Sequence, residues 1–289
     1  MRIGTLIAER SKPFVSLEFF PPAEKEALPD FYNVVARLQS LNPLFASVTY
    51  GAGGSKQDRT LGVTAELVRM GITTMAHLTC VGASCERLSL FLKSLKDVGV
   101  ENVLALRGDP PKDGNFSPSD SSLLHASDLA RFITDEDPAM GIAVACYPTP
   151  HPESPSFASD RKYTAYKLKV ADFGVTQLFF DVREYFALVS DLQALGVEKP
   201  VIPGILTVQS FASLRRILSL SGASIPGKLY LSMEEADRKG GAQAVREAGI
   251  AFAARQIREL LDGGALGVHL YTLNRADICL ELMDRVGSL

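Results

Sequence analysis

Several features that mark specialised classes of protein are missing from this sequence of 289 residues. The four cysteines, Cys80, Cys85, Cys146 and Cys279, are scattered without a Cys-x-x-Cys pair, which disfavours a metal site or a disulfide framework. No apolar run approaches the roughly 20 residues that cross a bilayer. A signal peptide is not indicated either, because Glu9 soon interrupts the N-terminal apolar run. We therefore expect a cytoplasmic protein with reduced thiols and no membrane partner.

A basic stripe is also missing. The chain has 30 Lys and Arg residues against 33 Asp and Glu residues, a net charge of -3, so nucleic acid is not expected as a partner. Hydrophobic residues make up 46% of the chain and charged residues 22%, which is typical of a soluble globular protein. The length suits one barrel of alternating strands and helices.

Short apolar runs alternate with longer amphipathic stretches along the whole chain. The short runs show little polar alternation, as expected of buried parallel strands. The predicted strands are Phe14–Phe20, Leu44–Tyr50, Thr73–Cys80, Asn102–Leu106, Ile142–Tyr147, Val175–Phe180, Pro200–Leu206 and Gly267–Leu273. Apolar residues at helical spacing predict helices between them, for example over Phe31–Leu41, Glu86–Val98 and Ala242–Leu261.

Glycines follow several of the helical stretches, where a C-cap favours positive φ. These are Gly71, Gly99, Gly174, Gly196 and Gly263. Together the repeated units predict an α/β fold, a single-domain (β/α)8 TIM barrel over residues 1–289. A doubly wound open sheet is the alternative, but it would usually show a glycine-rich fingerprint after the first strand, where this chain reads Glu18-Phe19-Phe20-Pro21-Pro22.

Polar or ionisable groups lie in or just after every predicted strand but the seventh. In a barrel of this kind the active site lies at the C-terminal ends of the strands. Burial of such groups is costly without partners, so a ring of them indicates a ligand or a shared network. One long polar loop, Pro110–Ser122, follows the fourth strand, and loops of this kind are often functional.

Each polar group also has a structural interpretation. Glu18 suits a salt-bridged barrel residue, and His77 suits a core histidine with its hydrogen bonds satisfied. Arg107 and Asp109 could pair with each other, and Phe179 is most simply a core residue. Their convergence at one end of one barrel is what favours function.

Ordered motifs along the chain resemble those of the methylenetetrahydrofolate reductase family. The motifs include Val15-Ser16-Leu17-Glu18-Phe19-Phe20-Pro21-Pro22, Ser47-Val48-Thr49-Tyr50-Gly51-Ala52, Ala76-His77-Leu78-Thr79-Cys80, Leu104-Ala105-Leu106-Arg107-Gly108-Asp109, Thr176-Gln177-Leu178-Phe179-Phe180-Asp181 and Tyr271-Thr272-Leu273-Asn274-Arg275. Each motif is weak alone, but the ordered set is specific.

This resemblance implies a barrel that binds FAD. The flavin would take a hydride from NADH or NADPH and pass one to 5,10-methylenetetrahydrofolate, giving 5-methyltetrahydrofolate by ping-pong kinetics. Glu18 matches the family's general acid, and desolvation by its apolar neighbours is expected to favour the protonated form. Asp109 matches an aspartate beside the flavin and the pterin.

The resemblance also implies two sets of contacts. Folate or substrate contacts are implied for Gln177, Phe179, Tyr271 and Arg275. Flavin contacts are implied for Thr49, His77, Arg107, Gly108, Asp109, Ala126, Tyr147, His151, Asp160 and Lys169. No metal is implied, and we expect a homo-oligomer. The resemblance covers the catalytic barrel only, so regulation by S-adenosylmethionine through a further domain is not expected.

The sequence departs from the family at three places. Lys167-Leu168-Lys169 stands where the family has two adjacent basic residues, so one basic residue is lost near the expected diphosphate site. His125 replaces a common tyrosine. Ile217 falls where some relatives place a phenylalanine near the nicotinamide, which leaves the electron donor open.

Two other functions fit parts of the pattern. A metal-dependent lyase or hydrolase would need a compact ligand set, for which His77, His151 and His269 are available without a short motif. A flavoprotein subunit of a larger methylenetetrahydrofolate-reducing complex, with another electron donor, would have the same fold.

Overall fold

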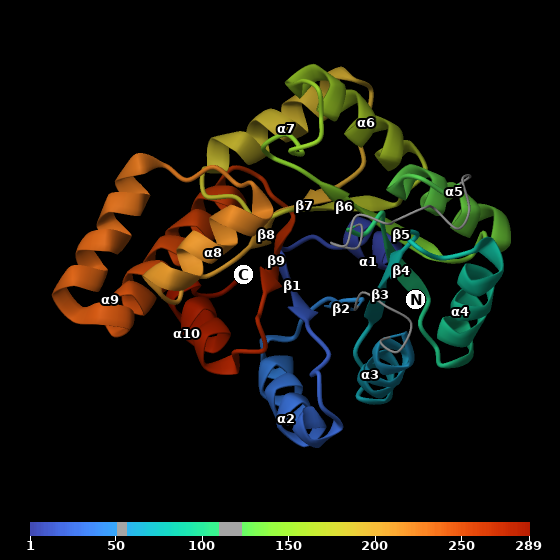
Figure 1. Ribbon diagram of the computed structural model, residues 1–289, viewed down its shortest axis with the longest axis horizontal. Helices are drawn as coiled ribbons and strands as arrows, with labels where there is room; N and C mark the ends of the chain where they lie inside the picture. Colours follow the sequence, from blue (N-terminus) through green and yellow to red (C-terminus); the bar gives the residue numbers. More distant parts are fainter. Residues whose placement is uncertain (51–56, 110–122) are drawn as a thin grey trace.

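Parallel strands surrounded by helices form the centre of the molecule (Figure 1). The structure is a computed structural model that describes residues 1–50, 57–109 and 123–289. The strands are β1 (Phe14–Phe19), β2 (Ala46–Val48), β3 (Thr74–Thr79), β4 (Asn102–Leu106), β5 (Gly141–Cys146), β6 (Phe173–Thr176), β7 (Val201–Ile202), β8 (Gly204–Ile205) and β9 (Gly267–Tyr271). Gly51 and Ala52 of the second motif, and the predicted loop Pro110–Ser122, lie outside the described residues.

The strands pair in the order β7-β6-β5-β4-β3-β2-β1-β9-β8. The predicted strand Pro200–Leu206 forms both β7 and β8, and it is interrupted at Pro203, which has no N–H for the ladder. β7 pairs with β6 and β8 pairs with β9, so this strand closes the ring. The prediction of a (β/α)8 barrel is therefore confirmed.

Helices cover the outside of the strands (Figure 1). They are α2 (Leu28–Leu38), α3 (Gln57–Arg69), α4 (Cys85–Asp97), α5 (Ala126–Glu136), α6 (Phe157–Lys169), α7 (Val182–Ala194), α8 (Phe211–Ser221), α9 (Gly227–Asp262) and α10 (Ala276–Val286). α9 is bent at Gly240 and Gly241, whose backbone angles are not helical. The predicted helix Ala242–Leu261 is the part of α9 that follows this bend.

The N-terminal end of the barrel is closed by α1 (Ile3–Ala8), which the sequence pattern did not predict. Ile3 and Ile7 pack into the apolar floor of the barrel, which also contains Phe14 and Phe45. The backbone N–H of Ile3 donates to Asn102 Oδ1 at 2.8 Å. Six residues are too few for a periodic signal, so this helix depends on tertiary contacts.

Two sequence predictions near β6 were wrong. The strand is Phe173–Thr176 rather than Val175–Phe180, and Gly174 lies inside it instead of capping a helix. A Cβ at Gly174 would lie 2.5 Å from Cys146 Sγ, so close strand–strand packing explains this glycine. Gly263 was also expected to have positive φ, but its φ is -80° and the following Gly264 takes the left-handed conformation.

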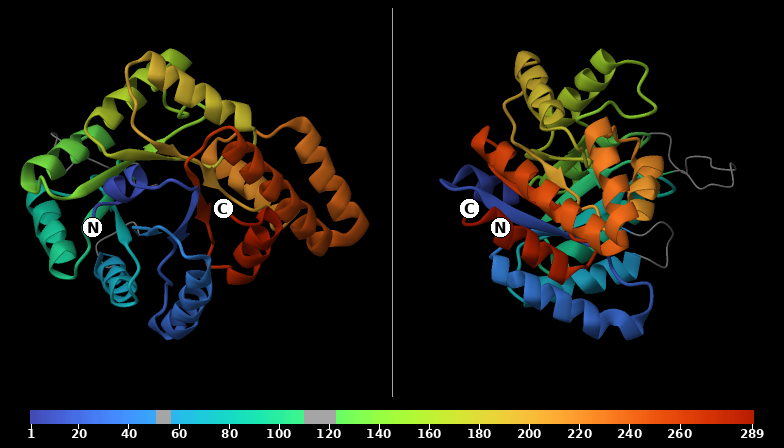
Figure 2. Two further views of the ribbon diagram at one scale, coloured as in Figure 1. Left: turned by 180° about the vertical axis from the view of Figure 1, so that it is seen from behind. Right: turned by 90° about the vertical axis from the view of Figure 1, so that its left-hand side faces the viewer.

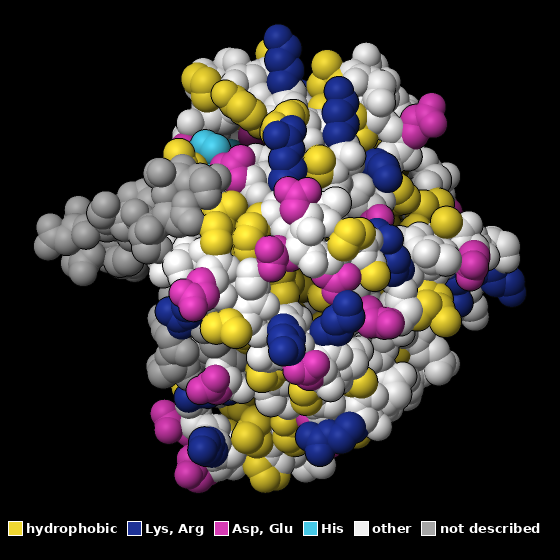
Figure 3. Space-filling model, turned by 90° about the vertical axis from the view of Figure 1, so that its right-hand side faces the viewer, with side chains coloured by type: hydrophobic (Ala, Val, Ile, Leu, Met, Phe, Trp, Pro, Cys, Tyr) yellow, Lys and Arg dark blue, Asp and Glu magenta, His cyan; other side chains and the backbone are white. Residues whose placement is uncertain are grey.

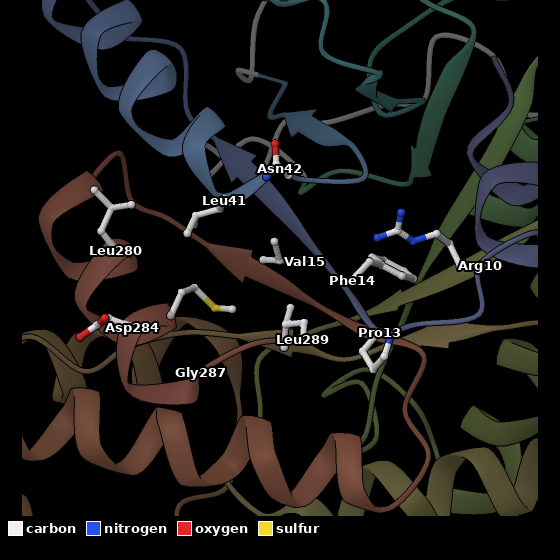
Figure 4. Close-up of a pocket in the computed structure, with 11 residues that line it drawn as sticks. Arg10, Pro13, Phe14, Val15, Leu41, Asn42, Leu280, Asp284, Gly287 and Leu289 are labelled. Carbon is white, nitrogen blue, oxygen red and sulfur yellow. The ribbon is translucent and has the colours of Figure 1, made fainter.

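Both termini lie at the N-terminal end of the barrel, as the side view in Figure 2 shows. A cavity of about 490 Å³ opens there beside Leu289. Its walls come from the start of β1, from Leu41 and Asn42, and from the end of α10, with Arg10 and Asp284 as its charged residues (Figure 4). This cavity is at the opposite end from the polar strand ends.

Acidic and basic side chains are interspersed over the face shown in Figure 3. This mixture matches the small net charge of -3. In the described part of the chain, no helix is both long enough and apolar enough to cross a membrane.

Candidate active site

Strand alternation explains which side chains enter the barrel. Phe14 of β1 belongs to the apolar floor, whereas Val15 and Leu17 pack outward against the helices. Side chains alternate across a strand, so Ser16 and Glu18 also point inward above Phe14. By the same alternation, Ser47 of β2, His77 of β3 and His269 of β9 point into the barrel. All three lie above the apolar floor. The interior is thus apolar at the N-terminal end and polar toward the C-terminal end.

Glu18 lies between two histidines. Its Oε2 atom is 3.3 Å from His77 Nε2 and 3.7 Å from His269 Nε2. All three side chains are buried. The Nε2 atom of His77 is close enough for an ion pair, yet it has no aligned hydrogen-bond partner among the described residues. An acid is therefore held at the C-terminal end of β1 by flanking bases.

The ionisation of Glu18 differs from the sequence-based expectation. Burial raises its pKa, but the imidazoles of His269 and His77 outweigh burial and lower the pKa to about 2. The carboxyl group is therefore charged at neutral pH when the site holds no ligand. Desolvation by Phe19 and Phe20 was expected to favour the protonated form, but Phe19 points away from Glu18 because adjacent residues face opposite sides of a strand.

Arg107 follows β4 and pairs with Glu153 instead of Asp109. Its Nη1 and Nη2 atoms lie 2.5 Å and 3.0 Å from the two carboxylate oxygens of Glu153. This guanidinium holds the pKa of Glu153 below its usual range. Asp109 is exposed at the mouth, and its charge contributes to the raised pKa of Tyr147, which is mainly due to burial. The proposed Arg107–Asp109 pair is therefore wrong.

Gly108 brings the backbone close to β3 at this point. Its φ is +83°, and a Cβ would lie 3.0 Å from Thr79 Cβ. Both features require glycine. The chain can therefore turn directly after β4 while packing closely against Thr79 of β3.

Tyr147 and His151 form one wall of the mouth after β5. Their rings meet edge to face at 4.9 Å. The loop is fixed from α6, because Asp160 Oδ1 accepts from the His151 N–H at 3.0 Å. Arg161 donates to the carbonyls of Tyr147 and Pro148, both at 2.8 Å. The Asp160 Oδ2 atom has no aligned hydrogen-bond partner among the described residues, but it lies 3.5 Å from Arg161 Nη1.

Lys167, and not Lys169, reaches toward this wall. The Lys167 Nζ atom donates to Ala145 O at 2.7 Å and lies 5.8 Å from the centre of the Tyr147 ring. Burial lowers the pKa of Lys167. Lys169 is the exposed last residue of α6, at the helix end that leads back to the N-terminal end of the barrel. Lys169 thus lies away from this wall, and its role as a flavin contact stays a prediction.

Gln177 and Phe179 have different environments although they are two residues apart. Gln177 is half-buried after β6, and its Oε1 accepts from the Leu178 N–H at 2.9 Å. The amide nitrogen is therefore the end that remains to face a ligand. Phe179 is buried in the core and stacks on Tyr185 of α7 at 6.0 Å. The alternation ends with β6 at Thr176, so Phe179 joins the core, and its contact with the substrate stays a prediction.

The segment after β9 ties the mouth together. Tyr271 donates from its hydroxyl to Thr176 O at 2.5 Å. Thr272 Oγ1 donates to Glu18 O, also at 2.5 Å. Asn274 accepts from the Phe20 N–H at 3.1 Å and donates to Phe20 O at 2.7 Å. Arg275 is exposed and 3.5 Å from Asp277.

Asn274 adopts a left-handed conformation, with φ of 56°. We expect Asn274→Ala to lower the free energy of unfolding by about 1–3 kcal/mol, because two hydrogen bonds are lost and alanine is strained at this φ. Asn274→Gly removes the same bonds without the strain. Chemical denaturation of the two variants measures both terms, and equal stability of Asn274→Ala and the parent chain would contradict this role.

Two further predicted contacts occupy neighbouring positions at strand or helix ends. Thr49 follows β2, and its N–H donates to Phe19 O at 3.0 Å. Ala126 is the half-buried first residue of α5. Among the described residues, no group of three His, Cys, Asp or Glu side chains has an arrangement suited to a metal ion.

Ser16, Ser47, His269 and Lys167 were missed as site residues. Ser16 and His269 lie two residues before Glu18 and Tyr271 on the same strands. Ser47 lies opposite Glu18 on the neighbouring strand β2. That signal was present in the sequence, because inward positions alternate. Lys167 could be identified only from the structure, because Lys167 and Lys169 differ in where their side chains lie and not in residue type.

The sequence matches a known family over nearly the whole chain. The profile of the family "Methylenetetrahydrofolate reductase" matches residues 2–287. The chain belongs to the methylenetetrahydrofolate reductase family. Its similarity to the family is therefore not confined to the motifs at the strand ends.

Members of the family differ in length. "Methylenetetrahydrofolate reductase 1" of Schizosaccharomyces pombe is 35% identical over 97% of this chain, which spans only 47% of that protein. The chain thus covers about half of the eukaryotic relatives that it matches. The "5,10-methylenetetrahydrofolate reductase" of Escherichia coli is 32% identical over 94% of this chain and 90% of its own length.

A solved structure has a similar fold. It is an uncharacterised Clostridium thermocellum protein described as binding two copies of 5-methyl-5,6,7,8-tetrahydrofolic acid. The TM-score is 0.68 at 12% identity, over 98% of this chain and 99% of that one. At this identity, the similarity is evidence of the fold alone.

Proposed function

We propose that this chain reduces 5,10-methylenetetrahydrofolate to 5-methyltetrahydrofolate with electrons from NADH or NADPH, using bound FAD. The observation that carries the proposal is Glu18, buried at the C-terminal end of β1 between His77 and His269, in a chain that the family matches from residue 2 to residue 287. Cytoplasmic location and assembly into a homo-oligomer remain predictions.

The polar groups at the barrel mouth fit a flavin. His77 Nε2 has no aligned hydrogen-bond partner among the described residues, although Glu18 Oε2 lies 3.3 Å away, so a polar ligand could complete its hydrogen bonding. Arg107 and Lys167 supply positive charge for a diphosphate. When bound, FAD supplies two-electron transfer between the nicotinamide and the folate.

The remaining flavin contacts are assigned from the same ring of residues. They are Thr49, Asp109, Ala126, Tyr147 and His151. Gln177 presents its amide nitrogen for the pterin edge, while Tyr271 and Arg275 lie after β9 on the folate side. The negative charge of Asp109 favours a cationic folate at the mouth.

Glu18, which is charged in the empty site, has one chemical task in this scheme: it takes up a proton once the ligands are bound and delivers it to N10 of the folate. Protonation of N10 opens the imidazolidine ring and makes the methylene carbon electrophilic. Nicotinamide oxidation needs no such proton. The two substrates would use one site in turn, which is ping-pong kinetics.

Purified protein should be yellow and should release FAD on denaturation. The absorbance spectrum, followed by chromatography of the released cofactor, tests this directly. A colourless protein that still reduced methylenetetrahydrofolate would contradict the flavin assignment.

Gln177→Glu should weaken folate binding without slowing nicotinamide oxidation. Glutamate can still accept from the Leu178 N–H, so the variant keeps the local hydrogen bond and changes only the amide nitrogen to an oxygen. Loss of one hydrogen bond costs about 0.5–1.5 kcal/mol, or more if the partner is left unpaired. Steady-state kinetics should show a raised KM for folate. Equal loss in both partial reactions would mean that Gln177 is structural.

A further inference from the structure

Arg161 of α6 is a buried charged residue behind the mouth wall that Tyr147 and His151 form. It is only 4% exposed. Its Nη1 atom donates to Tyr147 O and its Nη2 atom donates to Pro148 O, both at 2.8 Å. Its Nε atom donates at 3.0 Å to Asp191 Oδ2 on α7, the helix beside α6 (Figure 1). One guanidinium therefore joins the loop after β5 to two helices.

The positive charge of Arg161 is balanced where it lies. Asp160 Oδ2 is 3.5 Å from Nη1, and Asp191 Oδ2 is 3.0 Å from Nε. The Phe157 ring lies over the guanidinium, 4.7 Å from its Cζ atom. A buried charge is tolerated when it is both paired and hydrogen-bonded. Arg161 meets both conditions, so its guanidinium has a defined position.

The two carbonyls that accept from Arg161 belong to consecutive residues. Pro148 is buried and Tyr147 is half-buried, and a buried carbonyl without a partner costs free energy. A planar guanidinium has five N–H groups in fixed directions, so it can serve two carbonyls and a carboxylate at once. An ammonium group on a flexible stem cannot hold the same fork. The geometry therefore requires arginine.

Other contacts hold the later part of the same loop. Asp160 Oδ1 accepts from the His151 N–H at 3.0 Å, and the Glu153 carboxylate pairs with Arg107 across the mouth. These contacts fix the middle and the end of the loop, whereas Arg161 fixes its start, where the chain leaves β5. Loss of Arg161 would therefore leave the wall anchored on one side.

We propose that Arg161 is a positioning residue that holds the wall of Tyr147 and His151 in the shape that binds the flavin. This role rests on the proposed function, in which both wall residues contact FAD and Lys167 lies against the Tyr147 ring. A wall that is ordered before its ligand arrives lowers the entropic cost of binding. Removal of the fork should therefore weaken FAD binding, although Arg161 itself lies behind the wall.

Amide hydrogen exchange of the flavin-free chain is the first test. The N–H groups of His151, Glu153 and Ser154 are hydrogen-bonded to Asp160 Oδ1, His151 Nδ1 and His151 O. In Arg161→Leu these three amides should exchange roughly 10-fold faster or more, because their loop has lost its buried anchor. The amides of β1 should exchange as in the parent chain. Unchanged exchange at the three loop amides would overturn the proposal.

Titration with FAD, followed by fluorescence quenching, is the second test. Arg161→Leu should bind FAD roughly 10-fold more weakly or worse. Arg161→Lys keeps the charge without the fork, so it should also lose most of the affinity. Parent-like affinity in the lysine variant would show that charge alone matters, which contradicts positioning. Arg131→Leu is the matched control, because Arg131 is exposed on α5, where it stacks on Tyr166 at 5.0 Å. It should bind FAD as the parent chain does.

The remaining outcomes are also decisive. If Arg161→Leu does not fold, Asp191→Ala takes its place, because the Asp191 side chain is 48% exposed and its loss removes the partner of Nε. Both measurements should then shift in the same direction by a smaller factor, and no shift would count against the proposal. Faster exchange with unchanged FAD affinity would overturn the link to the flavin. A parent chain that bound no FAD would contradict the proposed function, and the exchange measurement would still decide whether Arg161 holds the loop.

Discussion

Glu18→Gln should reduce turnover of methylenetetrahydrofolate by about 10²–10⁴-fold, the usual contribution of a general acid. Glutamine has nearly the same size and can still contact His77 and His269, but it cannot supply an acidic proton. Oxidation of NADH or NADPH with a small artificial electron acceptor should continue at close to the parent rate. Stopped-flow measurement of the two partial reactions separates these effects.

A uniform loss in both partial reactions would instead indicate damage to the barrel mouth. The pH dependence of unfolding gives an independent control. Because the pKa of Glu18 in the fold is about 2, below the usual 4.5, its charge stabilises the protein above pH 4.5. That stabilisation is lost as the pH falls from 4.5 toward 2. Glu18→Gln should therefore lose less stability than the parent chain over this interval.

Lys167→Met should weaken FAD binding by roughly 10-fold to 100-fold, which corresponds to one hydrogen bond to a charged group. The reason is the position of Nζ, which lies against the Tyr147 ring and Ala145 O. Lys169→Met is the matched control, because Lys169 is exposed at the end of α6. It should bind FAD as the parent chain does.

Titration of the apoprotein with FAD, followed by fluorescence quenching, measures both variants. Because burial lowers the pKa of Lys167, its charge is lost as the pH rises through a value below the usual 10.5. FAD affinity in the parent chain should therefore fall with rising pH earlier than an exposed lysine would allow. Weaker binding in Lys169→Met than in Lys167→Met would show that the sequence-based choice was the correct one.

The fold was accessible from the sequence because buried parallel strands have a distinctive composition. The first four predicted strands all coincide with observed ones to within a few residues. The boundaries of β6 were less accessible, because the apolar residues Leu178, Phe179 and Phe180 continue the pattern after the strand has ended. α1 was missed since its contacts with the barrel floor come from distant parts of the chain.

The candidate site was only partly accessible. The motif around Glu18 indicated the proposed acid, but not its charge, which depends on His269 about 250 residues later in the chain. The pairing of Arg107 with Glu153 also joins distant segments. The alternation of inward and outward residues along β1 and β9 would have identified Ser16 and His269. No local pattern separates Lys167 from Lys169, because both are lysines on one helix.

The most direct test of the proposed function is turnover by the purified chain alone. The protein, loaded with FAD, is mixed with 5,10-methylenetetrahydrofolate and NADH or NADPH, and the products are identified by mass spectrometry. We predict that 5-methyltetrahydrofolate forms in amounts equal to the nicotinamide oxidised. If 5-methyltetrahydrofolate formed only after another protein or another electron donor was added, the chain would instead be a subunit of a larger complex, and the central claim would be wrong.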